Sequence, residues 1–186
     1  LFNEWVEKKY NYKDFLDKLC NAINKNDSHV LEEVLRIEWD NTADKVIEKI
    51  QKAEGDFVIL SHGTGYYIQK LLHEKGLFKV KLYSNEEYNE MKNFNGREKE
   101  LSYSFCNGID KVKIINYLKE KYPYIYYVGD SLSDIVPCKL ADECFAKGAL
   151  QHMLSDQKVD FIPINNFSDI EKYLIEKEVI SGEDKF

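Results

Sequence analysis

The chain has a shortage of positive charge and of long apolar runs. Acidic residues outnumber lysine and arginine by 33 to 26, for a net charge of −7. An acidic surface is a poor match for nucleic acid, which attracts basic patches. No polybasic cluster indicates a membrane-surface site, and no apolar run approaches the ~20 residues that a membrane span requires. We therefore expect neither nucleic acid nor a membrane as a partner.

Closely spaced cysteines are also absent. The four cysteines are Cys20, Cys106, Cys138 and Cys144, and no two of them form a Cys-x-x-Cys pair. This spacing disfavours a four-cysteine zinc site. We expect buried free thiols in a reducing compartment, and hence a cytoplasmic protein.

The chain of 186 residues is long enough for one domain, or for one domain with a small appendage. Apolar residues in segment 1–37 recur at spacings of three and four, which is typical of amphipathic helices. The pattern changes at segment 57–60, a continuous apolar run of the kind found in parallel strands covered on both faces. The sequence therefore predicts an α/β fold in which a helical segment precedes a core with a parallel sheet.

Segments 78–83 and 101–105 alternate apolar and polar residues, and we interpret them as an antiparallel, hairpin-like excursion with one exposed face. Further helices are expected over residues 66–75, 111–121 and 169–177, and two short strands at 143–146 and 161–164.

The most informative stretch is residues 124–134, in which a β-branched and aromatic run ends at a glycine and an acid. Such a run is typical of a buried strand. Asp130 follows the strand directly, and Asp134 stands where the next helix begins. In open α/β sheets, ligands bind beyond the carboxyl ends of the strands. Two carboxylates at that edge favour a hard cation such as Mg²⁺.

Two other loops carry groups that suit a phosphoryl ligand. Ser61, His62 and Gly63 follow the strand at 57–60, and a turn of small residues before a helix directs backbone N–H groups at an anion. Lys111 opens the helix predicted at 111–121. A hydroxyl, free amides, a lysine and a carboxylate pair are the parts needed to hold a phosphoryl group and its metal.

In this order the motifs resemble those of the haloacid dehalogenase (HAD) superfamily, and most of all its phosphoserine phosphatase and methylthiopentenyl phosphate phosphatase subfamily. The strand that ends in Ser61 resembles the second family motif, and the lysine within 107–115 resembles the third. The Gly-Asp-x-x-x-Asp pattern at 129–134 resembles the fourth, and 141–147 looks like the next strand. The resemblance covers about residues 38–175.

The resemblance implies a Rossmann-like core at 38–186 and part of a helical cap at 1–37. It implies that Ser61 and the amides near it, at His62 and Gly63, bind phosphoryl oxygens. Lys111 would neutralise charge on the phosphate and on an attacking carboxylate.

The same resemblance makes Asp130 a Mg²⁺ ligand and Asp134 a second ligand or a support for the first. Several alternatives stay open. Lys111 could be a solvated lysine of the first helical turn, or Lys113 could replace it. His62 could contact the phosphate, contact the leaving group or be an ordinary turn residue. Ser61 could be a helix cap, and the two acids could be turn and cap residues.

One family motif is missing. The family's nucleophile lies in an Asp-x-Asp motif at the end of the first strand, and no Asp-x-Asp occurs in this chain. Because residues 1–37 resemble the cap that follows this strand, and because the chain begins with leucine, we expect the motif upstream of Leu1.

The implied function is that of a Mg²⁺-dependent phosphomonoesterase acting on a small phosphorylated metabolite through an aspartyl-phosphate. The chain as given would be inactive by itself. The alternative is a non-catalytic relative that binds a phosphorylated ligand or a partner protein. A receiver domain also carries acids at strand ends, but the helical N-terminal segment and the serine-containing loop disfavour it. The sequence indicates neither the substrate nor the oligomeric state.

Overall fold

The computed structural model describes Asp14, Lys18 and residues 28–85 and 109–182. The chain divides into two compact units, unit 1 (Leu1–Glu38 and Val58–Asp110) and unit 2 (Trp39–Phe57 and Lys111–Phe186). Each unit is described by itself. The boundary predicted between residues 37 and 38 stays a prediction, and most of the predicted N-terminal helices lie outside the described residues.

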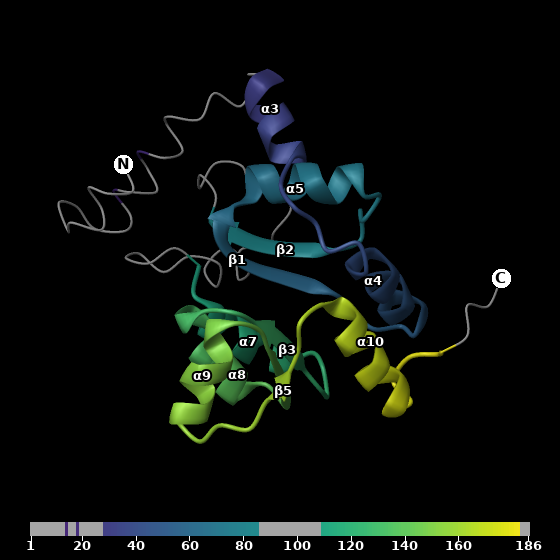
Figure 1. The fold of residues 1–186 in the computed structure, drawn as a ribbon, viewed down its shortest axis with the longest axis vertical. Helices are drawn as coiled ribbons and strands as arrows, with labels where there is room; N and C mark the ends of the chain where they lie inside the picture. The colour runs from purple at the N-terminus through teal and green to yellow at the C-terminus, as the bar shows by residue number, and fades with distance from the viewer. Residues whose placement is uncertain (1–13, 15–17, 19–27, 86–108, 183–186) are drawn as a thin grey trace. The chain divides into compact units, whose positions relative to one another are not determined.

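Unit 1 contains a strand–helix–strand motif. Its elements are α3 (Ser28–Leu35), β1 (Val58–Thr64), α5 (Gly65–Glu74) and β2 (Lys81–Asn85). Strands β1 and β2 are parallel, and Ser61 is the partner of Ser84 in their register. Helix α5 packs on both strands (Figure 1) and ends before Gly76, whose φ of 68° suits glycine at the end of a helix.

The antiparallel prediction for segment 78–83 is wrong. This segment becomes β2, which pairs with β1 in the parallel direction. A helix between two strands returns the chain to the starting end of the sheet, so that the second strand runs parallel to the first. The other half of the predicted excursion, 101–105, lies outside the described residues.

Unit 2 contains a second parallel sheet. Its elements are α4 (Ala43–Lys52), α7 (Lys111–Lys119), β3 (Tyr126–Gly129), the 3₁₀-helix η1 (Leu132–Asp134), α8 (Ile135–Leu140), β4 (Glu143–Ala146), α9 (Ala149–Asp156), β5 (Ile162–Pro163) and α10 (Phe167–Glu176). The strand order is β3-β4-β5, with both pairings parallel. The predicted α/β class with parallel strands is therefore confirmed, whereas α9 was not predicted.

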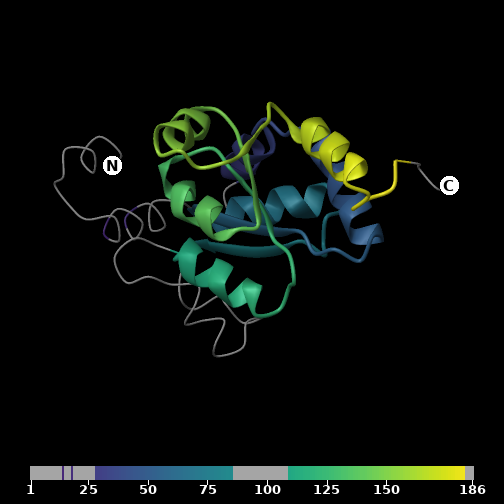
Figure 2. The same ribbon diagram turned by 90° about the horizontal axis from the view of Figure 1, so that it is seen from below.

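The core of unit 2 lies between its sheet and helices α4 and α10. Its buried residues are Val46, Phe145, Ile164, Ile170, Leu174 and Ile180. Helices α4 and α10 lie side by side in both views (Figures 1 and 2). An ion pair of 2.8 Å joins Lys49 of α4 to Glu171 of α10. Helices α4 and α10 thus pack together with the core residues of the sheet.

The expectation of free thiols is wrong for two of the four cysteines. Cys138 of α8 and Cys144 of β4 form a disulfide, and both side chains are buried. The chain reverses between α8 and β4 and brings the two Cα atoms to 5.2 Å, within the range that a disulfide spans. Cys20 and Cys106 lie outside the described residues, and the cytoplasmic location stays a prediction.

Membrane-spanning helices are absent from residues 28–85 and 109–182, where no helix combines the length and apolarity needed to cross a bilayer.

Candidate functional site

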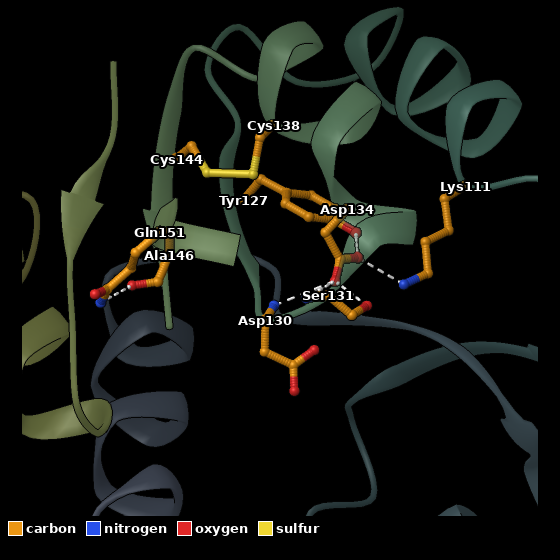
Figure 3. Close-up of a disulfide and its surroundings, with 9 residues drawn as sticks. All are labelled: Lys111, Tyr127, Asp130, Ser131, Asp134, Cys138, Cys144, Ala146 and Gln151. Atoms are coloured by element: carbon orange, nitrogen blue, oxygen red, sulfur yellow. Dashed lines mark hydrogen bonds and ion pairs between the residues drawn. A yellow bond between two sulfur atoms is a disulfide. The ribbon is translucent and has the colours of Figure 1, made fainter. Parts of the chain in front are cut away.

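The loop after β3 gives its two acids opposite surroundings. The Asp130 side chain is exposed, and in Figure 3 its carboxylate points away from its neighbours. Asp134 is 3% exposed and turns back under the loop. Its Oδ2 atom accepts hydrogen bonds from the Ser131 hydroxyl at 2.9 Å, from the Ser131 N–H at 3.1 Å and from the Asp130 N–H at 3.2 Å. These three bonds hold the loop in a closed turn.

Gly129 is required for this closed turn. A Cβ atom added at Gly129 would stand 2.5 Å from the Cβ of Asp134, closer than two non-bonded carbon atoms can approach. The glycine at the end of β3 therefore lets the buried acid pack against the strand.

Lys111 provides the charge that balances Asp134. Its Nζ atom lies 2.7 Å from Asp134 Oδ1 and donates a second hydrogen bond of 3.2 Å to the Ser133 hydroxyl. Lys113, the alternative site lysine, is exposed on α7. The ion pair with Asp134 is thus made by Lys111, and the choice of site lysine stays a prediction.

Tyr127 of β3 completes the surroundings of Asp134. Its phenol O–H donates to Asp134 Oδ1 at 2.7 Å (Figure 3). Burial, followed by the charge of Asp134 and this hydrogen bond, raises the pKa of Tyr127 far above its usual range. The phenol is therefore a permanent donor at neutral pH.

The pKa of Asp134 results from opposing effects. Burial acts to raise it, but hydrogen bonds from Lys111 and Tyr127, the positive charge of Lys111 and the Ser131 hydroxyl together lower it below the usual value. Asp134 is therefore ionised at neutral pH despite being buried.

Ser61, His62 and Gly63 lie in unit 1, within β1 (Val58–Thr64) and not in a loop after the strand as predicted. The pairing with β2 is irregular between Ser61 and Thr64. The Ser61 hydroxyl oxygen accepts a 3.0 Å hydrogen bond from the Gly63 N–H, which leaves the Ser61 O–H to donate elsewhere. A ring nitrogen of His62 lies 3.2 Å from the carbonyl oxygen of Ile109, so this nitrogen carries a proton and donates. A Cβ added at Gly63 would stand 2.1 Å from the hydroxyl oxygen of Tyr67, so a side chain here would require the Tyr67 side chain to move.

The structure thus brings together Asp130, Asp134 and Lys111 in unit 2, and Ser61, His62 and Gly63 in unit 1. The metal and phosphate roles of these six residues stay predictions. In the part of the chain that the structure describes, no three His, Cys, Asp or Glu side chains gather as a potential metal site.

Sequence reasoning missed Tyr127 and gave no role to Ser131 and Ser133. Tyr127 was counted as one more apolar residue of a buried strand. A usable signal was present, because a buried tyrosine normally needs a partner for its hydroxyl, and an acid lies seven residues further on.

The chain is similar to curated proteins named 2-hydroxy-3-keto-5-methylthiopentenyl-1-phosphate phosphatase. It is 28% identical to the protein of Bacillus cytotoxicus over 134 residues, which cover 69% of this chain and 59% of that protein. It is 28% identical to the protein of Exiguobacterium sibiricum over 144 residues, with coverages of 73% and 63%. The alignments thus span about three fifths of the length of these relatives. No known family profile matches the chain.

Proposed function

We propose that this chain is part of a Mg²⁺-dependent phosphomonoesterase of the HAD type, acting on a small phosphorylated metabolite. The observation that carries the proposal is the exposed Asp130 carboxylate beside the buried Lys111–Asp134 ion pair, at the carboxyl end of β3. Ligands of open α/β sheets bind at this edge. The similarity to proteins named as phosphatases supports the same reaction class.

Lys111 has hydrogen-bonding capacity left for a phosphoryl oxygen. A lysine ammonium group has three N–H donors, and the described contacts use two, to Asp134 and Ser133. The third can donate to a substrate. In unit 1, the Ser61 hydroxyl and the nearby backbone amides at His62 and Gly63 would donate to phosphoryl oxygens.

The two acids suit different tasks toward a metal. Mg²⁺ commonly takes one or two protein carboxylates, together with water and phosphate oxygens. The exposed Asp130 carboxylate fits such a ligand. Asp134 fits a support, because five donors already use its two oxygens. When bound, Mg²⁺ would offset negative charge on the phosphoryl oxygens.

None of the six residues with a proposed metal or phosphate role would act as the nucleophile. An aspartyl-phosphate mechanism requires a carboxylate that attacks phosphorus, and the resemblance assigns this role to an Asp-x-Asp motif that the chain does not contain. Lys111 would place its positive charge near the phosphate and near the carboxylate that attacks it.

The test compares two variants of the full-length gene product, including any sequence that precedes Leu1. Asp130→Asn should lower turnover of a phosphomonoester panel by about 100-fold or more, because it removes the carboxylate that would hold Mg²⁺ against the phosphoryl oxygens. Asp156→Asn, at an exposed position in α9, is the matched control and should retain full activity. Survival of activity in Asp130→Asn would refute the metal role of Asp130.

The non-catalytic alternative predicts a different result. A full-length product that turns over no phosphomonoester, yet binds inorganic phosphate in isothermal titration with Mg²⁺, would favour a phosphate-binding protein over an enzyme. Absence of both activity and binding would count against both proposals.

A further inference from the structure

The Tyr127 hydroxyl and the Lys111 ammonium group share one acceptor. Both donate to Oδ1 of Asp134, each at 2.7 Å (Figure 3). The tyrosine ring is 6% exposed, so water cannot easily replace its hydroxyl. The two donors therefore depend on the orientation of the same carboxylate.

Five donors fix the orientation of that carboxylate. Two reach Oδ1, and the three donors of Ser131 and Asp130 reach Oδ2. A carboxylate offers about four lone-pair sites, so none remains unused. Any rotation of the Asp134 carboxylate would break several of these bonds together.

Among these five donors, the Tyr127 hydroxyl alone comes from a β-strand. The others come from the loop after β3 or from the long, flexible side chain of Lys111. Tyr127 pairs in register with Cys144 of β4, and Cys144 is bonded to Cys138 of α8. Tyr127 is thus held by strand pairing to β4, which the disulfide joins to α8.

We propose that Tyr127 is a positioning residue, which orients the Asp134 carboxylate and thereby places the Lys111 ammonium group. Its hydroxyl links the ion pair to strand β3. The importance of this placement for catalysis rests on the phosphate-binding role proposed for Lys111, but the placement itself can be measured without it.

The first experiment measures the accessibility of individual lysines in the 186-residue chain. Brief acylation followed by peptide mass spectrometry gives a labelling rate for each lysine. Tyr127→Phe removes one hydroxyl from an otherwise unchanged ring. The labelling rate of Lys111, whose side chain is 10% exposed, should rise about fivefold, since a hydrogen bond to a charged group is lost.

One internal reference and one control variant make the result specific. Lys49 is 8% exposed and ion-paired with Glu171, so its labelling rate reports general loosening of unit 2 and should not change. Tyr126→Phe is the matched control, because Tyr126 is the adjacent strand residue, packed against the core cluster. It should leave the Lys111 rate at the wild-type value.

Three results would overturn the proposal. The Lys111 rate could remain unchanged in Tyr127→Phe, it could rise together with the Lys49 rate, or it could rise equally in Tyr126→Phe. The second and third results would assign Tyr127 a general structural role only.

The second experiment uses the full-length gene product and a phosphomonoester that it hydrolyses. Tyr127→Phe should lower kcat about 5- to 20-fold and change KM less than about twofold, because a misplaced lysine affects the charge that develops in the transition state. A wild-type protein without turnover would refute the proposed function, and the labelling experiment would still decide the role of Tyr127. An unchanged kcat in an active enzyme would overturn any effect of Tyr127 on the reaction.

Discussion

At the scale of single residues, Asp130 and Asp134 show how two acids in one short motif take different roles. Asp130 is exposed, whereas Asp134 is buried and accepts five hydrogen bonds. A buried charge is tolerated only when it is paired and hydrogen-bonded. Asp134 meets both conditions through Lys111 and Tyr127, and it thereby fixes the loop that carries Asp130.

Replacing Asp134 with Asn should lower the free energy of unfolding by about 3 kcal/mol, because it leaves the buried Lys111 charge unpaired and turns one acceptor into a donor. Urea unfolding followed by circular dichroism would measure this loss. Asp130→Asn is the matched control and should change stability by less than about 0.5 kcal/mol, as is usual for exposed sites. Equal effects of the two substitutions would contradict the assignment of Asp134 as the buried support.

The same pair of proteins should differ in pH dependence. The folded-state pKa of Asp134 is lowered, so its contribution to stability is fully present above its unfolded value and is lost as pH falls through the folded value. The stability advantage of wild type over Asp134→Asn should therefore be constant above about pH 5 and shrink below about pH 4. An advantage that grew on acidification would contradict this sign. Urea unfolding at a series of pH values provides the test.

At the scale of elements, the segments that connect strands and helices determined the strand direction and the cysteine pairing, which local sequence patterns did not predict. The alternation in segment 78–83 is compatible with either strand direction, and helix α5 makes β2 parallel to β1. The disulfide is a similar case, since Cys138 and Cys144 are six positions apart without any recognised cysteine motif. They meet because α8 packs on β4.

Loss of this disulfide should destabilise unit 2. Closing a loop of this length stabilises a protein by about 2 kcal/mol in the chain-entropy description. Urea unfolding of the double variant Cys138→Ala/Cys144→Ala should therefore give a free energy of unfolding about 2 kcal/mol lower than that of wild type. A thiol reductant should remove most of the difference. Its effects on Cys20 and Cys106 would be common to both proteins. Detection of free Cys138 and Cys144 thiols in the untreated protein by alkylation would contradict the bond.

At the scale of the whole molecule, the chain combines the residues proposed to bind phosphate with the absence of an Asp-x-Asp motif. The 186-residue chain by itself should therefore show no Mg²⁺-dependent turnover of phosphomonoesters, because the proposed mechanism needs a carboxylate nucleophile. Phosphate release from a substrate panel, measured with and without Mg²⁺, tests this. Turnover that depends on Mg²⁺ and on Lys111 would refute it and would require a nucleophile within residues 1–186.

The order of apolar and polar residues was enough to predict the class of fold and the location of the motifs. Apolar runs bounded by glycine and acids marked β1 and β3, because strand burial requires continuous apolar residues whatever the remainder of the chain does. The spacing of Asp130 and Asp134 likewise placed one acid after a strand and the other at the start of a helix.

Which side chains contact one another depends on how the elements pack, and could not be predicted from local patterns. Lys111 and Asp134 are 23 positions apart, and Tyr127 comes from a strand that the sequence showed only as apolar. Local patterns report burial and secondary structure, whereas the partner of a buried hydroxyl, charge or thiol depends on how α7, α8 and the sheet pack. Packing therefore buried Asp134 among its donors, paired Cys138 with Cys144 and left the Asp130 carboxylate exposed.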